Sequence, residues 1–314
     1  MIFFLGALPP PKGGVSIYCM RRLDELNGKC VPHIFFDSSR KLPFVKLVFS
    51  CLIMIFNKRN FEVEFNVSNP LSIFIFYILG LSKYTVFIDH NGSRRIIGSR
   101  FSKWVFNRFS IALKEIKVVN ATLKNNYPNC RQKDIKVFSP FIKPTQRELD
   151  ESAKTFPKDF THLLRGDNPN IVLVTAWKPV NTQEEPDLYG LFDTLSIFKS
   201  VIKDYPDNNF VFMLGSLEDN DFCKSLLNEV DDLSNFDNFY FITGGVSQLP
   251  LMPYTKALIR LSKTDGDSIS IREALFFGVR VIASDVITRP EGVTVCSVNN
   301  LLSVKSELIK ILED

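Results

Sequence analysis

Short apolar runs alternate with amphipathic stretches along the whole chain. In the first half, such runs predict strands over 2–5, 31–36, 61–67, 84–89, 116–119 and 135–138. In the second half, they predict strands over 170–175, 210–214, 239–242, 257–259 and 279–283. Helical spacing of apolar residues separates the strands, most clearly over 15–26, 188–203 and 301–312. Alternation of strand and helix is typical of parallel α/β sheets.

A polar stretch divides this pattern into two parts. The prolines of SPFIKP (139–144) are followed by the polar run TQRELDESAKTFPKD. We therefore predict an N-terminal Rossmann-like domain over 1–145, a linker over 146–168 and a C-terminal Rossmann-like domain over 169–300. We expect residues 301–314 to form a helix that packs at the domain junction. The length of 314 residues is enough for two domains with separate cores.

Two apolar runs in the first half do not fit the strand pattern. The run over 47–56 is framed by basic residues and is too short to span a bilayer, which takes ~20 residues. It fits either a helix at a membrane surface or a buried core helix, and the sequence leaves both open. The run over 71–81 has no charge on its amino side, and we expect it in the core.

Composition and cysteine usage bound the class of protein. Hydrophobic residues make up 45% of the chain and charged residues 23%, as in soluble globular proteins. The six cysteines are scattered without a C-x-x-C pair, which indicates thiols in a reducing compartment. The start, MIFFLGALPPPKGG, lacks the basic region of a signal peptide. We therefore expect a cytoplasmic protein.

Charge is distributed unevenly. Residues 1–150 hold 23 Lys and Arg against 10 Asp and Glu, a net charge of +13, whereas residues 151–314 hold 15 against 24, a net charge of −9. Basic residues alternate with aromatic ones over 94–109 and predict an amphipathic basic helix. Such a helix suits an anionic acceptor or lipid headgroups. A solvated basic face remains an alternative, and because no nucleic-acid-binding module surrounds the helix, we expect no nucleic acid partner.

The richest candidate chemistry lies in RLSKTDGDSISIREALFFGVRVIASD (260–285). A strand, a polar turn with Asp265 and a helix with Glu273 follow one another, so both carboxylates can face one cleft beside the amino end of the helix. That end binds anions through its unpaired N–H groups. A ligand that is anionic in one part and rich in hydroxyls in another, such as a nucleotide-sugar, fits this arrangement. Alternatively, Ser270 and Glu273 form a capping box, and Asp-Gly is an ordinary turn dipeptide.

The segment TDGDSISIREALFFGVRVIASD resembles the E-x7-E region of retaining glycosyltransferases with the GT-B fold, family four. The resemblance implies that Asp265, one methylene shorter than the usual Glu, contacts the donor sugar as a catalytic residue. It implies that Glu273 binds the ribose hydroxyls. Further donor contacts are expected in the same segment, at Lys263, Gly266, Asp267, Ser268 and Ile269.

Other turns carry weaker similarities to this family. Gly13 and Gly14 follow the first strand, where family members often have a glycine pair that lines the cleft. His90-Asn91-Gly92 resembles the family's His-Gly turn with one residue inserted, which implies a catalytic role for His90. The family usually contacts the diphosphate through an Arg and a Lys-Gly pair. This chain lacks the Lys-Gly pair, so we expect Lys178 and Arg260 to contribute the positive charge.

We therefore expect two doubly wound Rossmann-like domains that face each other across a cleft, the GT-B arrangement. The resemblance implies a retaining hexosyltransferase. No D-x-D or ligand cluster with metal spacing stands at a convincing strand end, so we expect a metal-independent enzyme without a cofactor. It would move a sugar from a nucleotide diphosphate sugar to a hydroxyl acceptor. The basic first half suggests a lipid-linked saccharide acceptor in bacterial O-antigen, lipopolysaccharide or capsule biosynthesis, with peripheral contact to the inner membrane face. A GT-B-fold nucleotide-sugar epimerase and a non-catalytic nucleotide-sugar or nucleic-acid binding protein remain alternatives.

Overall fold

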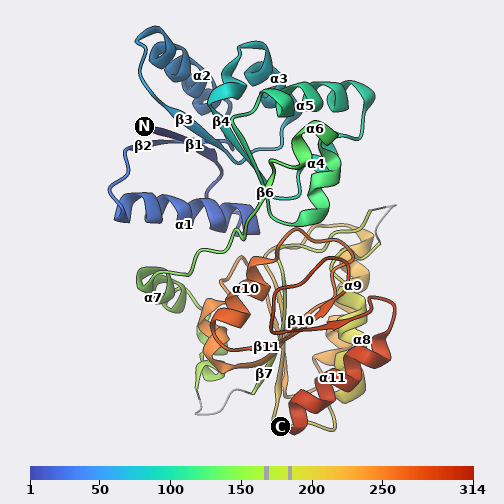
Figure 1. Ribbon diagram of the computed structural model, residues 1–314. Coiled ribbons are helices and arrows are strands. Elements are labelled where there is room, and N and C mark those ends of the chain that lie inside the picture. Colours follow the sequence, from blue (N-terminus) through green and yellow to red (C-terminus); the bar gives the residue numbers. More distant parts are fainter. Residues whose placement is uncertain (166–169, 183–185) are drawn as a thin grey trace. The chain divides into compact units, whose positions relative to one another are not determined.

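The computed structural model describes residues 1–165, 170–182 and 186–314 (Figure 1). The chain divides into two compact units, Met1–Ile142 and Lys143–Asp314. Each unit contains one six-stranded sheet in which all the strands that pair run parallel. The expected fold class, two doubly wound α/β units, is confirmed.

The first unit alternates strands and helices in chain order. Its sheet has the order β2-β1-β3-β4-β5-β6. The strands are β1 (Ile2–Gly6), β2 (His33–Asp37), β3 (Glu62–Phe65), β4 (Thr85–Asp89), β5 (Glu115–Val118) and β6 (Lys136–Val137). The helices are α1 (Gly14–Gly28), α2 (Lys41–Phe56), α3 (Pro70–Ile78), η1 (Leu81–Tyr84), α4 (Ser93–Ile96), α5 (Arg100–Ala112), η2 (Ala121–Asn126) and α6 (Asn129–Gln132).

The second unit begins with two helices and then alternates in the same way. Its sheet has the order β12-β11-β10-β7-β8-β9. The strands are β7 (Ile171–Ala176), β8 (Asn209–Leu214), β9 (Phe239–Ile242), β10 (Thr255–Arg260), β11 (Arg280–Ser284) and β12 (Val293–Cys296). The helices are α7 (Gln146–Lys154), η3 (Lys158–Leu164), α8 (Leu191–Val201), α9 (Asp221–Leu233), η4 (Leu249–Tyr254), α10 (Ile269–Phe276) and α11 (Leu301–Glu313).

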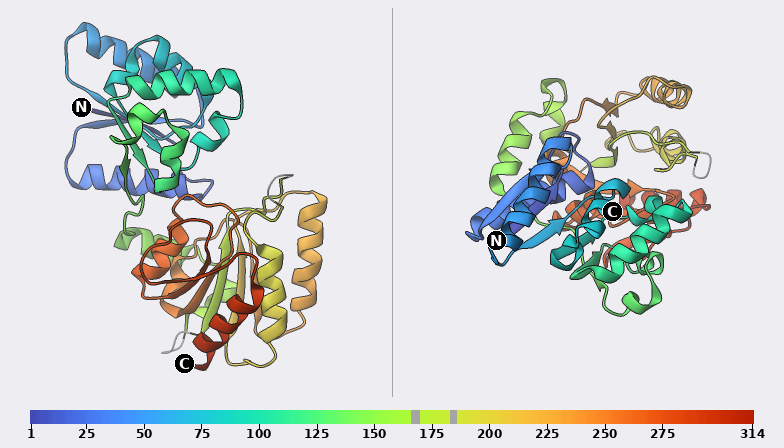
Figure 2. Two further views of the ribbon diagram at one scale, coloured as in Figure 1. Left: turned by 45° about the vertical axis from the view of Figure 1, so that its right-hand side comes forward. Right: turned by 90° about the horizontal axis from the view of Figure 1, so that it is seen from above.

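Each sheet is buried on both faces, as parallel sheets require. In the first unit, α2, α3 and α5 cover one face and α1 covers the other (Figures 1 and 2). In the second unit, α8, α9 and α11 cover one face, and α10 with η3 and η4 covers the other. Phenylalanine, at 29 residues, fills much of this volume, with Phe3, Phe65 and Phe87 in the first unit almost fully buried.

Both strand orders contain a point at which the winding direction reverses. In the first sheet this point lies between β1 and β3, and in the second it lies between β7 and β10. The loops that leave the carboxyl ends of these two strands diverge to opposite faces of the sheet. They leave a crevice there, which is where open α/β sheets bind ligands.

Several boundaries differ from the sequence-based expectation. The division between the units falls after Ile142, and the expected linker contains α7 and η3, which belong to the second unit. Residues 166–168 of that linker lie outside the described residues. The C-terminal helix α11 packs on α8 and on strands β10 to β12 of the second unit. Strand β12 was missed because two of its four residues are exposed and no apolar run marks it.

The run over 71–81, which we expected in the core, is only partly buried. Ile73 and Phe76 on α3 are fully buried, whereas Leu71 and Ile78 are 64% and 61% exposed. The helix is therefore apolar on both its inner and its outer side. Within the described residues, no helix combines the length and the apolar character needed to cross a membrane.

A close backbone approach in the second unit gives a stability prediction. A Cβ at Gly215 would lie 2.3 Å from the Trp177 ring and 2.7 Å from the Trp177 carbonyl oxygen. Because the ring and the backbone cannot both move away, we expect Gly215→Ala to destabilise the protein by ~1–3 kcal/mol. Gly28→Ala is the control, since a Cβ there meets no atom within 4 Å and should change stability by less than ~1 kcal/mol. Urea unfolding measures both. Equal effects of the two substitutions would contradict the steric argument.

Candidate functional site

In the second unit, the carboxylate of Asp265 is held from several sides by the protein. It lies in the loop between β10 and α10, and its Oδ2 accepts hydrogen bonds from Arg289 Nη1 at 2.9 Å and Ser262 Oγ at 3.1 Å. Oδ1 accepts from the backbone N–H of Gly266 at 3.0 Å. The side chain of Arg289 is 1% exposed and that of Asp265 is 10% exposed. The pair is therefore a buried ion pair, and it fixes the shape of the loop.

Arg289 was not among the residues expected from the sequence. It lies in the segment after β11, where its Nε donates to the Ser284 carbonyl at 2.8 Å and its Nη2 donates to Ser284 Oγ at 3.0 Å. Arg289 is separated from Asp265 by 24 residues. An isolated Arg in a polar segment carries no local signal of burial, so only the tertiary structure reveals this contact.

Glu273 is buried on α10 and has an identified partner in a different loop. It is 4% exposed, and its Oε2 accepts a hydrogen bond from Gln248 Nε2 at 2.5 Å. Helix α10 begins at Ile269 with Ser268 as its N-cap, so Ser270 is the second helical residue. A capping box needs its acid at the third helical position, which is Ile271. This excludes the capping box that the Ser270-x-x-Glu273 pattern suggested.

The rest of the loop is committed to its own geometry. Asp267 forms a bidentate ion pair with Arg272 on α10, with N–O distances of 2.9 to 3.1 Å. Ser268 and Ser270 are joined through their hydroxyl groups at 2.8 Å. Ile269, the first residue of α10, is 9% exposed. The polar side chains at the amino end of α10 thus brace the turn.

Arg260 and Lys263, both expected at the diphosphate, make contacts within the protein. Arg260 Nη1 donates to the Thr175 carbonyl at 3.0 Å and so ties the end of β10 to β7. Its guanidinium lies 4.5 Å from the ring centroid of Tyr189 and its Nε lies 3.9 Å from Asp265 Oδ2. Lys263 Nζ donates to the Pro186 carbonyl at 3.0 Å. Both cations lie beside the switch point and add positive potential there.

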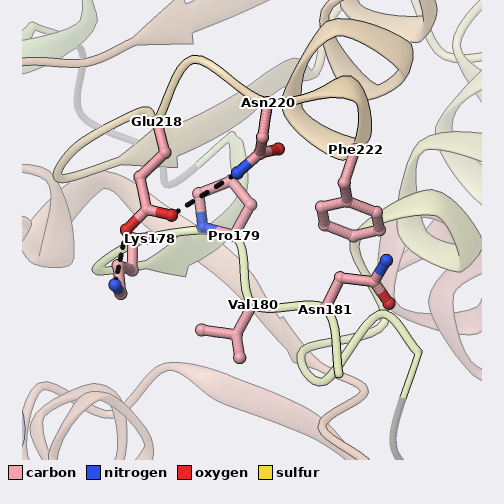
Figure 3. Close-up of a pocket in the computed structure, with 7 residues that line it drawn as sticks. All are labelled: Lys178, Pro179, Val180, Asn181, Glu218, Asn220 and Phe222. Carbon is pink, nitrogen blue, oxygen red and sulfur yellow. Dashed lines mark hydrogen bonds and ion pairs between the residues drawn. The ribbon is translucent and has the colours of Figure 1, made fainter. Parts of the chain in front are cut away.

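Lys178 lies at the rim of a pocket of about 460 Å³, formed by the loops that follow β7 and β8 (Figure 3). Its Nζ donates to Glu218 Oε1 at 2.6 Å, and its side chain is 43% exposed. Asn220 Nδ2 donates to the other oxygen of Glu218 at 3.4 Å. The pocket is lined by Lys178, Pro179, Val180, Asn181, Glu218, Asn220 and Phe222. The pocket therefore has polar side chains along one edge and apolar side chains along its wall, and it lies at the carboxyl end of the sheet.

In the first unit, the turn that carries His90 is built by Asp89. The fully buried carboxylate of Asp89 accepts the backbone N–H of Gly92 at 2.8 Å, the N–H of Ser93 at 3.2 Å and the Tyr127 hydroxyl at 2.9 Å. Tight packing against Ser68 explains the glycine at position 92, where a Cβ would lie 1.7 Å from the Ser68 hydroxyl oxygen. The turn holds His90 at the carboxyl end of β4.

His90 is neutral at physiological pH. Burial lowers its pKa from 6.5 to about 4. Its Nε2 lies 3.0 Å from Asn66 Oδ1, and because this oxygen only accepts, Nε2 carries the proton and Nδ1 is an acceptor. The ring also packs against Tyr18, with 4.9 Å between ring centroids. His90 can thus exchange hydrogen bonds with a hydroxyl but carries no charge.

Beside His90 lies a polar cluster that the sequence did not reveal. Glu64 on β3 is 5% exposed and accepts from the Tyr18 hydroxyl at 3.2 Å and from Arg22 Nη2 at 3.1 Å. Burial and the Glu64 charge raise the pKa of Tyr18. The sequence carried little signal of this burial, because FEVEF alternates Glu62 and Glu64 with apolar residues, as a half-exposed strand does. Buried charges need partners, but the sequence does not say which residues supply them.

Gly13 and Gly14 lie at the start of α1. Gly13 is the N-cap and Gly14 the first residue of the helix. The Gly13 N–H donates to Ser16 Oγ at 3.0 Å. A Cβ at Gly13 would meet no heavy atom within 4 Å, so packing within the protein does not require glycine there. This open surface follows β1, one of the two strands at the switch point of the first sheet.

Comparison with known proteins identifies the architecture. No protein-family model and no curated protein sequence matches the chain. Solved structures do match. HepE of Anabaena, in complex with UDP and glucose, gives a TM-score of 0.64 at 11% identity over 100% of this chain and 90% of that chain. The UDP-forming α,α-trehalose-phosphate synthase of Burkholderia vietnamiensis gives 0.65 at 10% identity over 99% and 90%. The chain has the GT-B fold. A structure from E. coli bound with UDP-2-fluoro glucose also matches, with a TM-score of 0.66 at 9% identity over 99% of this chain and 91% of that chain.

The buried ion pair gives a prediction for Arg289. Replacing it with methionine removes the cation in hydrogen-bond contact with the buried Asp265 carboxylate and leaves only Arg260, at 3.9 Å, so we expect Arg289→Met to destabilise the protein by ~3–5 kcal/mol. Arg280→Met is the matched control, because its pair with Asp314 is exposed and should contribute less than ~1 kcal/mol. Urea unfolding distinguishes the two. Similar losses for both variants would show that Arg289 does not neutralise a buried charge.

The lowered pKa of His90 gives a pH prediction. Between pH 6.5 and 4 the unfolded chain binds a proton at His90 that the folded chain does not. This residue's contribution to stability is therefore present above pH 6.5 and is lost as the pH falls toward 4. We expect His90→Gln to remove this contribution. As the pH falls from 6.5 to 4, the melting temperature of the variant should therefore decrease less than that of the wild type. The exposed His162→Gln should follow the wild type, and a parallel curve for His90→Gln would refute the assignment.

Proposed function

We propose that this protein is a retaining glycosyltransferase that moves a hexose from a nucleotide diphosphate sugar to a hydroxyl acceptor. The observation that carries the proposal is the loop and helix after β10 of a GT-B fold, with Asp265 and the buried Glu273 next to the switch point of the second sheet. The structural neighbours that bind UDP, glucose or UDP-2-fluoro glucose support a nucleotide-sugar donor.

In this proposal the diphosphate binds at the amino end of α10. The backbone N–H groups at the amino end of α10, from Ser268 onward, donate to it, and Lys178, Arg260 and Lys263 supply positive charge. Preorganised donors of this kind stabilise the charge that develops on the leaving group, and such stabilisation usually accounts for more of an enzyme's rate enhancement than any other effect. We propose that these groups suffice without a metal ion or cofactor.

Glu273 would bind the ribose hydroxyls of the donor. Its present partner, Gln248, is a neutral amide, and a ribose hydroxyl can replace or share that hydrogen bond at moderate cost. The amide keeps the buried carboxylate satisfied when no donor is bound. The carboxylate of Glu273 could therefore accept hydrogen bonds from the two ribose hydroxyls without a rearrangement of α10.

Asp265 would act at the donor sugar despite its ion pair with Arg289. Its Oδ1 accepts only a local backbone N–H in the contacts described above, and a carboxylate oxygen has a second lone pair for a sugar hydroxyl. In the first unit, neutral His90 would exchange hydrogen bonds with a sugar hydroxyl. Gly13 and Gly14 would allow close approach of a substrate to the backbone.

For the acceptor we propose a lipid-linked saccharide at the cytoplasmic face of the membrane, used in cell-surface polysaccharide assembly. The net charge of +13 over residues 1–150 supports an anionic environment for that acceptor. The biosynthetic context of O-antigen, lipopolysaccharide or capsule belongs to this proposal as well.

The function is tested by titrating UDP, UDP-glucose and a panel of other nucleotide-sugars, followed by transfer assays with the donor that binds and with lipid-linked saccharides. We expect one donor to stabilise the protein, transfer that persists in EDTA, and a product with the anomeric configuration of the donor. Release of nucleotide without any acceptor would indicate an epimerase or hydrolase. Binding without turnover in every assay would leave a binding protein.

Glu273 provides the sharpest variant. We expect Glu273→Gln to weaken nucleotide binding ~10–100-fold, because a charge-assisted hydrogen bond contributes ~1.5–3 kcal/mol. The isosteric amide can still pair with Gln248, so the melting temperature should change little. Glu229→Gln, in a half-exposed ion pair with Lys199, is the control and should bind as the wild type does. Calorimetry measures both. Unchanged affinity with a large drop in melting temperature would assign Glu273 a purely structural role.

A further inference from the structure

Three helices of the first unit form one continuous layer on the sheet. Aromatic contacts join α2 to α3 through Phe44 and Phe76, with ring centroids 5.8 Å apart. They join α3 to α5 through Tyr77 and Trp104, with centroids 6.4 Å apart. Figures 1 and 2 show α2, α3 and α5 on the same side of the sheet, opposite α1. The outer side of this layer is therefore a single surface.

That outer surface is strongly apolar. We call it the apolar face, and its exposed residues are Leu42, Val45, Phe49, Leu52, Ile53, Ile55, Phe56, Leu71, Ile78, Leu79, Phe101, Trp104 and Ile111. Phe56 is 87% exposed, and Phe49 and Phe101 are 62% and 65% exposed. The inner sides of the same helices already fill the core through residues such as Leu47, Phe76 and Phe109. The outer apolar residues nevertheless leave much of their surface to solvent, and contiguous surfaces of this kind mark interaction sites.

The polar residues around the apolar face have one sign of charge. The chain contains no Asp or Glu over 38–61, 66–88 or 90–114, the stretches that carry the three helices. Exposed basic residues surround the helices instead: Arg40, Lys41, Lys46, Lys58, Arg59, Lys83, Arg94, Arg100, Lys103 and Arg108. Arg40, just before α2, lies 3.9 Å from the Asp37 carboxylate. A surface adapted to water alone normally mixes both signs.

We propose that the apolar face docks on an anionic lipid bilayer, with the apolar residues in the interface and the Lys and Arg side chains at the headgroup phosphates. Apolar burial and electrostatic attraction both favour this partner. A second copy of the chain would bring two basic surfaces together, and nucleic acid would leave the aliphatic residues without a partner. The inference rests on the surface itself and stands whether or not the protein transfers sugars.

Binding is measured by cosedimentation of the full-length protein with vesicles. We expect the protein to sediment with vesicles that combine phosphatidylcholine and phosphatidylglycerol. It should bind vesicles of phosphatidylcholine alone far more weakly. Added salt should weaken the binding, since headgroup attraction is screened over a Debye length. Equal binding to both kinds of vesicle, or none to either, would overturn the proposal.

Matched variants locate the surface. Lys46→Glu/Lys58→Glu should weaken partitioning at least ~30-fold, since each basic residue near an anionic surface contributes about fivefold. Phe56→Ser should weaken it ~10-fold or more. The controls in the second unit are Leu302→Ser, at a side chain 81% exposed, and Lys154→Glu, and both should bind as the wild type does. All the altered residues are exposed, so melting temperatures should hold. Binding that is unchanged in the first two variants would exclude this face.

Fluorescence provides a second, independent readout. The chain contains two tryptophans, and Trp177→Phe leaves Trp104 of the apolar face as the single emitter. Anionic vesicles should shift its emission to the blue as the half-exposed ring leaves water. A protein that binds vesicles without this shift would dock through another surface. Light scattering and an RNA retention assay complete the test, because a dimer or an RNA complex abolished by Phe56→Ser would replace the bilayer as the partner.

Discussion

Parallel strand pairing is the constraint on which the rest of this structure depends. Two parallel neighbours cannot be joined by a tight turn, so each connection crosses the sheet and usually carries a helix. Helices then cover both faces of each sheet, and the carboxyl ends of all its strands lie at the same edge. β7 and β10 are neighbours in the sheet, although their crossovers lead to opposite faces. The loops after these two strands, which carry Lys178 and Asp265, therefore start side by side at the same edge of the sheet. The candidate site is a direct consequence of strand order.

The two acids of the site are satisfied in different ways. Asp265 is paired with a buried cation, Arg289, so its position is fixed and its charge is compensated at all times. Glu273 accepts a hydrogen bond from the neutral amide of Gln248. A sequence pattern that treats the two acids as equivalent misses this distinction. The Asp265 carboxylate organises its own loop, whereas the Glu273 carboxylate joins α10 to the loop that carries Gln248.

Much of this arrangement was predictable from the sequence, and the limits are physical. Apolar runs identify buried strands because both faces of a parallel sheet exclude water, and β12 was missed because it is a short edge strand with exposed residues. The turn of His90 and the loop of Asp265 were recognisable because local residue types build them. The partners of Asp265 and Glu273 were not, since Arg289 and Gln248 come from distant loops and an isolated Arg or Gln gives no sign of burial. The sequence therefore predicted the local turns and loops but not the long-range pairs between side chains.

The two sides of α2 are governed by different surroundings. Leu47 and Cys51 face the protein interior, whereas Phe49 and Ile53 face outward, although these outer residues are as apolar as the inner ones. Because burial removes apolar surface from water, the inner side contributes most to the free energy of folding. A scan of stability along α2 would therefore follow the pitch of the helix, with sensitive positions every three to four residues. At the tolerant positions between them, only contacts of the outer side with a binding partner would restrict the choice of residue.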